Sequence, residues 1–389
     1  MGTWQNIKAV IGREFRILRN RPLYLVGTVG VITFCTVFFL SLMRDGLPHD
    51  IPVGTVDLDG SSISREFVRQ LDATQLSEVV HYPSFEQARE DLVSGRISAV
   101  CLLPEGLGED INANRQPKIT FYVNGLYFVS GALSWKSLLL MTNLTNGAVQ
   151  RQVLRAKGYN DDAIMGMIRP VDIDTHQIGN TTTNYSYYLC NVLLPAILEM
   201  IVIIILIYSL GAELKFGTSR HLLDTAGGSI LNALAGKLIV WTGIFSTIGF
   251  ILVLILYHQL HFPMAGSIWN MFLAIFLLVV ASEAVAIFIL EMLPVPRLAL
   301  SVGALYSVLG FSLAGFTLPL EAMTPWIQGL GSIFPIRHYY LFYVQEAIFG
   351  AGFAGWWKEV VWLLCFLFVP LLGLQRLKKA YIYQNYPKD

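Results

Sequence analysis

Three polar side chains interrupt long apolar runs of the sequence. Asn191 and Glu199 fall in the run 185–210, and Glu283 falls in the run 267–290. Carboxylates are costly to place inside a membrane, and those that occur there are often functional. The three side chains predict either an intramembrane polar path for a solute or a structural role, in which they are satisfied at a dimer interface or reach the membrane surface. The sequence favours neither of these two roles.

A second group of polar side chains lies between the first two apolar runs. Asp57, Asp59 and His81 are of the types that bind metal ions. The segment from Asp57 to Ser62 has equally the composition of a turn, with a serine placed to cap the helix that follows. We favour the turn. We expect no metal site, no bound cofactor and no catalytic residue on this chain.

The segment 211–237 carries the most distinctive polar pattern. A helix break and cap are indicated by Gly217-Thr218, and a small apolar face by Leu222-Leu223. The segment ends in Gly236-Lys237, which is followed by Leu238 and not by Ser or Thr. It is therefore not a phosphate-binding loop. From these residues alone, a turn at the membrane surface and a segment that binds a partner are equally good interpretations.

The elements that must position these residues are predicted membrane spans. Of the 389 residues, 54% are hydrophobic and only 14% are charged, whereas soluble proteins carry about 25% charged residues. The net charge is zero and gives no reason to expect a nucleic-acid partner. The apolar residues gather in runs that predict six transmembrane helices, and a further apolar hairpin within 298–350 stays open. The runs are 22–43, 185–210, 238–257, 267–290, 298–320 and 360–375.

Lys and Arg residues predict the orientation of these helices. With both termini in the cytoplasm, thirteen of them lie inside and only Arg337 and Lys358 lie in short outside loops, as the positive-inside rule requires. The tail 376–389 is then cytoplasmic. Segment 1–21 predicts a basic amphipathic helix, which either lies on the inner leaflet or packs on protein.

The segment 44–184 is predicted to lie outside and to fold. Strands are indicated at 52–57, 79–82, 97–103 and 118–123, and helices at 64–71, 84–93, 107–112 and 128–157. Alternating strands and helices are typical of an α/β domain. The predicted fold class is an α-helical polytopic membrane protein with an inserted small α/β extracytoplasmic domain.

The pattern in 211–237 resembles the ABC-2 type exporter permease family, in which a Glu, a Gly-Thr, a Leu pair and a Gly-Lys recur in this loop. Regions 56–61, 95–99 and 315–339 also resemble that family, which places re-entrant or interfacial helices in the last of them. The family often has Pro near Gly227, whereas this chain has Gly227-Gly228. We expect a more flexible link at that point. The matching loop residues are Glu213, Gly217, Thr218, Leu222, Leu223, Gly236 and Lys237.

The resemblance implies a non-catalytic transport subunit whose segment 211–237 forms a coupling helix. The residues expected to act together in coupling to the ATPase are Glu213, Lys215, Gly217, Thr218, Leu222 and Leu223. Two copies of a separate ABC ATPase, which bind ATP and Mg²⁺, are the implied power source. A second permease, identical or a paralogue, membrane lipids and a periplasmic adaptor are the other expected partners. The expected location is the plasma membrane, in particular a bacterial inner membrane. The expected cargo is amphipathic, lipid-like or drug-like, and it moves outward. An ion-driven secondary transporter is the alternative, for which internal repeats would be the signal.

Overall fold

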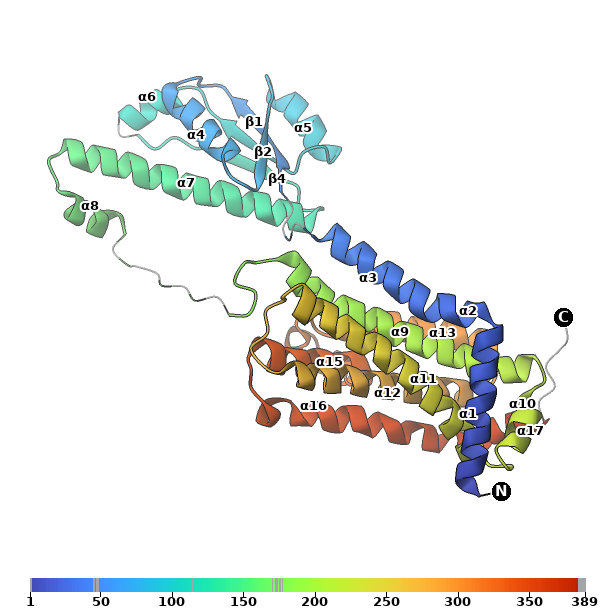
Figure 1. Cartoon of the computed structure of the whole chain (residues 1–389). Coiled ribbons are helices and arrows are strands. Elements are labelled where there is room, and N and C mark those ends of the chain that lie inside the picture. The colour runs from blue at the N-terminus through green and yellow to red at the C-terminus, as the bar shows by residue number, and fades with distance from the viewer. Residues whose placement is uncertain are drawn as a thin grey trace. The chain divides into compact units, whose positions relative to one another are not determined.

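The computed structural model describes residues 2–44, 46, 49–113, 115–169, 171, 174, 176 and 178–383, and it contains two compact units (Figure 1). Residues Met1–Gly46 and Gln177–Asp389 form the first unit, which we call the membrane unit. Residues Leu47–His176 form the second, which we call the α/β unit.

Among the described residues of the membrane unit, six helical segments are long and apolar enough to cross a membrane. They are Pro22–Leu42, Tyr185–Lys215, Ile230–Gln259, Ile268–Met292, Pro296–Leu313 and Phe353–Leu372. The second of them, α9 (Tyr185–Lys215), and the fourth, α12 (Ile268–Met292), are the most enclosed by protein. Their side chains form the centre of the apolar core, with α13 (Pro296–Leu313) against α9. The chain therefore has the fold of a polytopic helical membrane protein.

The remaining spans combine regular and modified helix. The first consists of α2 (Pro22–Leu25), a π-helical turn Val26–Gly30 and α3 (Val31–Leu42). The third joins α11 (Ile230–Val253) to a π-helical segment Leu254–Gln259. The last joins α16 (Phe353–Cys365) to a 3₁₀ helix Phe366–Leu372.

The third and last spans begin earlier than the hydropathy pattern predicts. Helix α11 starts at Ile230 and not at 238, because the Ser229 hydroxyl accepts a hydrogen bond from the Asn232 amide (3.4 Å) and caps it. Helix α16 starts at Phe353 and not at 360. The predicted loop 211–237 is consequently helical at both ends, and only 216–229 connects α9 to α11.

Short helices follow α13, where a spanning hairpin had stayed open. They are a 3₁₀ turn Leu320–Ala322, α14 (Pro325–Gly331), α15 (Pro335–Tyr343) and a π-helical turn Val344–Ile348. With 7 and 9 residues, α14 and α15 are too short to cross about 30 Å of hydrocarbon. Each begins with a proline at its first position, which favours the start of a separate helix.

Both ends of the chain add a helix to the membrane unit. Helix α1 (Thr3–Asn20) packs along α11, and α17 (Leu374–Tyr383) packs against α10 (Ser219–Thr225). Figure 1 shows α1, α10 and α17 near one another at one end of the bundle. The predicted tail 376–389 is thus helical as far as Tyr383, and its residues 384–389 lie outside the described part of the chain.

The described part of the α/β unit contains a four-stranded sheet with the order β2-β1-β3-β4. Strand β1 pairs in parallel with β2 and β3, and β4 runs antiparallel to β3. The strands are β1 Ile51–Asp57, β2 Ser77–His81, β3 Ala99–Leu103 and β4 Thr120–Val123. The helices are α4 Ser62–Asp72, α5 Phe85–Val93, α6 Leu107–Asn112, α7 Phe128–Ala156 and α8 Asp161–Ile168.

Successive residues of β3 supply both faces of this sheet, because side chains alternate along a strand. Ala99, Cys101 and Leu103 pack with buried residues of α4, α6 and α7. Val100 packs on the opposite face with Ala88 of α5. The helices therefore cover both faces of the sheet.

Candidate functional site

Four charged side chains meet inside the membrane unit, where α1, α9 and α11 come together. Arg13 and Glu14 come from α1, Glu213 from α9 and Lys237 from α11. Glu14 is fully buried, and Lys237 and Glu213 are exposed by only 1% and 3%. The two acids and two bases cancel, so the cluster is neutral as a whole. We call these four residues the charge cluster.

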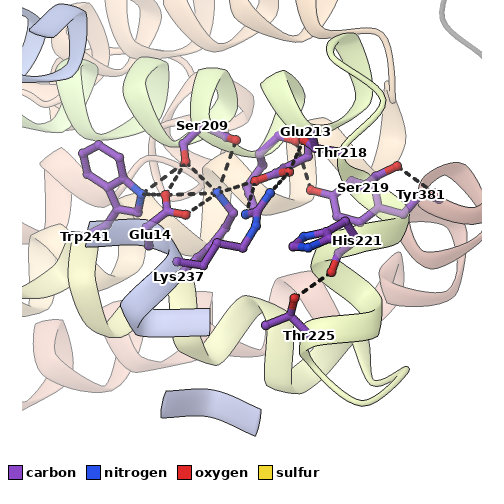
Figure 2. Close-up of polar contacts among 12 residues, drawn as sticks. Glu14, Ser209, Glu213, Thr218, Ser219, His221, Thr225, Lys237, Trp241 and Tyr381 are labelled. Atoms are coloured by element: carbon purple, nitrogen blue, oxygen red, sulfur yellow. Dashed lines mark hydrogen bonds and ion pairs between the residues drawn. The ribbon is translucent and has the colours of Figure 1, made fainter. Parts of the chain in front are cut away.

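Each member of the charge cluster lies against an opposite charge. Figure 2 shows Lys237 in contact with Glu14 and with Glu213. Arg13 Nη1 and Nη2 each lie 2.7 Å from a different carboxylate oxygen of Glu213. Lys237 Nζ lies 2.8 Å from Glu14 Oε2 and 3.2 Å from Glu213 Oε1. Ser209 Oγ and Trp241 Nε1 each donate a 3.0 Å hydrogen bond to Glu14 Oε1. Pairing of opposite charges in this way is what makes buried charges tolerable.

Gly236 lets α1 approach α11 closely enough to form the cluster. A Cβ atom at this position would lie 2.6 Å from Val10 Cβ and 3.1 Å from the carbonyl oxygen of Ile7. Real Cβ contacts are not that short, so a larger residue would push α1 away. The Gly236-Lys237 pair therefore combines a close-approach glycine with the ammonium that binds Glu14.

Helix α10 is joined to the charge cluster and to the C-terminal helix. Thr218 Oγ1 donates a hydrogen bond to Glu213 Oε2, directly before α10 begins. Ser219 Oγ donates to the carbonyl oxygen of Tyr381 (2.8 Å), and the Tyr381 hydroxyl donates to the carbonyl oxygen of Leu210 (3.0 Å). Figure 2 shows this chain of contacts from the cluster to α17. Helix α10 is thus held by both α9 and α17.

The residues expected to act together in 211–237 divide into a buried and an outward-facing set. Glu213, Leu222 and Leu223 are buried, so they support α10 and do not form its free surface. Thr218 is half-buried, and Lys215 and Gly217 are exposed. The sequence pattern did not single out the other exposed side chains of α10. These are Arg220, His221 and Asp224.

Sequence reasoning missed four members of the site and its surroundings: Arg13 as a partner, Glu14, Ser209 and Trp241. The signal available was the spacing of Asn6, Val10 and Glu14, which lie four residues apart on one face of α1 and are all buried. Trp4 and Phe15, two aromatic residues of the same helix, are 59% and 57% exposed. Helix α1 therefore packs on protein by one face and leaves aromatic side chains free on another.

Asn191, Glu199 and Glu283 are buried in three separate settings. Asn191 accepts a hydrogen bond from Tyr257 (2.8 Å) and donates one to the carbonyl oxygen of Tyr187 (2.7 Å). Glu199 is 1% exposed, and its Oε1 has no hydrogen-bond partner among the described residues. Glu283 accepts a 2.5 Å hydrogen bond from Thr242. No hydrogen bond or ion pair between described residues joins the three into one path.

In the α/β unit, Asp57 and Asp59 stabilise a turn. Asp57 Oδ1 accepts from the amides of Asp59 (3.1 Å) and Gly60 (3.0 Å), and Asp59 Oδ2 accepts from the Gly108 amide (3.1 Å). The hydrogen bond from the Ser61 side chain, with those from backbone amides, holds the pKa of Asp59 below its usual value. His81 Nδ1 lies 3.1 Å from Thr55 Oγ1. The described residues contain no group of three side chains suited to a metal ion.

Comparison with known proteins identifies the family. The model for the ABC-2 family transporter protein matches residues 23–374, which is nearly the entire chain. No curated protein matches the chain. Permeases of this family are typically non-catalytic membrane subunits and generally work with an ABC ATPase. The chain belongs to the ABC-2 family of transporter proteins.

Proposed function

We propose that this chain is the membrane-spanning subunit of an ATP-driven exporter, and that α10 is the surface on which a separate ATPase docks. The observation that carries this proposal is the set of contacts that hold α10 in place. Its inner side is fixed by Leu222, Leu223 and the hydrogen bond of Ser219 to Tyr381. Arg220 Nε also donates a 2.9 Å hydrogen bond to the carbonyl oxygen of Ile382 in α17, whereas His221 and Asp224 are exposed. A short, firmly held helix with a polar outer face is suited to bind a partner and to pass its movement on.

The hydrogen bonds and ion pairs around α10 determine which helices a movement of α10 would displace. Thr218 links α10 to Glu213 on α9, and Glu213 is bound in turn to Arg13 on α1 and Lys237 on α11. Displacement of α10 therefore acts on three helices at once, together with α17 through Ser219. ATP and Mg²⁺ belong to the partner in this mechanism, and this chain supplies the helices that move.

Two ATPase copies and a second permease complete the proposed assembly. The membrane is a plasma membrane, in particular a bacterial inner membrane, and the cargo is amphipathic, lipid-like or drug-like. Both termini and α10 lie in the cytoplasm, and the α/β unit lies outside, where a periplasmic adaptor is a further partner to test. Support for this orientation comes from the excess of Lys and Arg in the segments assigned to the inside.

Cysteine labelling tests the orientation. In a cysteine-free background, Val93→Cys places a thiol on the α/β unit at a position that is 75% exposed, and His221→Cys places one on the outer side of α10. A membrane-impermeant maleimide should label Val93→Cys in intact spheroplasts and His221→Cys only after lysis. The reverse result would invert the topology.

Co-purification tests the docking surface. Tagged protein in mild detergent is expected to retain an ABC ATPase, and Asp224→Arg is expected to lose it while keeping the thermal unfolding midpoint. Glu90→Arg makes the same charge change at an exposed position of α5 and should retain the ATPase. If no ATPase co-purifies in several detergents, the exporter proposal fails and ion-driven transport becomes the leading alternative. If Asp224→Arg retains the ATPase, α10 is not the docking surface.

A further inference from the structure

A groove of about 810 Å³ runs along the side of the membrane unit, between α11, α12 and the last span. Its walls are mostly apolar. Four of the lining side chains are polar: Glu283 comes from α12, and Thr242, Ser246 and Thr247 come from α11. The apolar lining includes Leu238, Phe250, Phe276, Ile287 and Leu367.

Two of these four polar side chains, Glu283 and Ser246, have unused hydrogen-bonding capacity. Glu283 Oε2 accepts from Thr242 Oγ1 at 2.5 Å, but Oε1 has no partner among the described residues. Ser246 Oγ, one helical turn beyond Thr242, also has no partner among them. Glu283 is only 2% exposed and Ser246 only 6%. Buried polar atoms without partners are rare because each one has lost its hydrogen bonds to water without replacement.

We propose that this groove binds an apolar amine, with the nitrogen at Glu283 and the hydrocarbon part along α11 and α12. An ammonium and a carboxylate, or a neutral amine and a carboxylic acid, share one proton and form a pair without net charge. Such a pair avoids the high energy of an isolated charge in a membrane. The terminal torsion of a glutamate is broad, so its carboxylate can turn toward the groove.

The depth of Glu283 distinguishes this ligand from a phospholipid head group. Glu283 lies about nine residues before Met292, the last residue of α12, which corresponds to about 14 Å along a helix. A hydrocarbon layer is about 30 Å thick, so Glu283 lies near its middle. A zwitterionic head group stays at the membrane surface, whereas a simple amine on a hydrocarbon chain can reach this depth. A pure hydrocarbon would fill the groove but leave Oε1 unpaired.

Gly243 provides a way to close the groove without changing its carboxylate. It lines the groove, and a Cβ atom added to it would meet no atom within 4 Å. A phenylalanine at this position would therefore project into free space and occupy the place of the ligand. Gly329 on α14 is a matched control, because a Cβ there also meets no atom within 4 Å and the residue does not line this groove.

The test is direct binding to the purified chain in phosphatidylcholine nanodiscs, without any ATPase. The probe is tritiated N,N-dimethyldodecylamine, and its comparison is tritiated 2-methyltetradecane, in which a CH group replaces the nitrogen. The wild type should bind about one amine per chain saturably, above the uptake of empty nanodiscs. Glu283→Gln should weaken binding at least tenfold, and Gly243→Phe should abolish it. Glu199→Gln changes an equally buried carboxylate that does not line the groove and should bind as the wild type does.

Three results would overturn the proposal: undiminished binding by Glu283→Gln, undiminished binding by Gly243→Phe, or equal binding of the amine and the hydrocarbon. Gly329→Phe should bind normally, and its failure to do so would assign the loss in Gly243→Phe to the added bulk alone. That the bound amine is cargo rests on the proposed export function, but binding itself does not. Failure of ATPase docking and failure of amine binding are therefore separate outcomes.

Discussion

Arg13 and Glu213 lie 200 positions apart in the sequence and form a two-point ion pair, in which both nitrogen–oxygen distances are 2.7 Å. A guanidinium and a carboxylate that meet in this way fix orientation as well as distance. The pair joins α1 to the end of α9, directly before the connection that contains α10. The position of α10 consequently depends on the first helix of the chain.

Removal of the Glu213 carboxylate should destabilise the membrane unit strongly. Glu213→Ala leaves the buried Lys237 with one acidic partner in place of two, and Arg13 with no carboxylate at 2.7 Å. Loss of one member of a buried ion pair costs about 3–5 kcal/mol. The expected result is a clearly lower thermal unfolding midpoint of the purified chain in detergent.

Glu66→Ala is the control for this experiment. It removes an acid that pairs with Arg69 on the surface of α4, and the midpoint should not change. An unchanged midpoint in Glu213→Ala as well would show that the charge cluster does not hold the helices together.

Gly217 should be replaceable only by residues that tolerate a left-handed backbone. Its φ is +66°, and an added Cβ would meet no atom within 4 Å, so any effect of substitution comes from the backbone. Asparagine adopts this conformation more readily than β-branched residues do. Gly217→Asn should therefore keep ATPase co-purification, and Gly217→Val should reduce it because the turn before α10 must change. Equal retention by the two variants would show that the turn geometry does not matter for docking.

Local sequence patterns predict much of the fold. The strand predicted at 52–57 is β1, and the helices predicted at 107–112 and 128–157 correspond to α6 and α7. Alternation in strands and capping residues at helix starts act over a few residues, so the sequence shows them directly. The starts of α11 and α16 were predicted too late. Both helices begin before the strongly apolar part of their sequence, and hydropathy alone does not mark that earlier start.

Only two of the four residues of the charge cluster stood out in the sequence. Glu213 and Lys237 stand in a recognisable loop pattern, whereas Arg13 and Glu14 are two charged residues in a helix that contains several. Their partners depend on how α1 packs across α9 and α11, and this packing depends on the missing side chain of Gly236. Contacts of this kind join residues far apart in the chain, and no local pattern specifies them.

Low pH should weaken the turn between β1 and α4, in which Asp59 also accepts a hydrogen bond from the Gly108 amide of α6. Hydrogen bonds to the Asp59 carboxylate lower its pKa in the folded state, from an ordinary value of 3.8. Folding is therefore stabilised above pH 3.8, and this contribution is lost as the pH falls below that value toward the folded pKa. Hydrogen exchange of the full chain, corrected for intrinsic rates, should show faster exchange in α6 as the pH is lowered from 5 to 3.

Asp59→Asn should remove much of this pH dependence, because the amide does not titrate. Glu90→Gln alters an exposed side chain of α5 and should leave the profile of α6 as in the wild type. The role given to Asp59 is incorrect if the wild type and Asp59→Asn respond to acid in the same way.

The Cys101 thiol should be protected from modification while the α/β unit is folded. Cys101 is fully buried on β3, and burial raises its pKa to about 12. The thiolate is the reactive form, so at pH 8 both the burial and the protonation of the thiol oppose reaction. In a chain that retains only Cys101, maleimide labelling should be slow in buffer and complete in denaturant. The matched chain with Val93→Cys as its only cysteine should react at once, because this position is 75% exposed. Equally fast labelling of both would mean that β3 opens readily, and the sheet would then not be the stable centre of the unit.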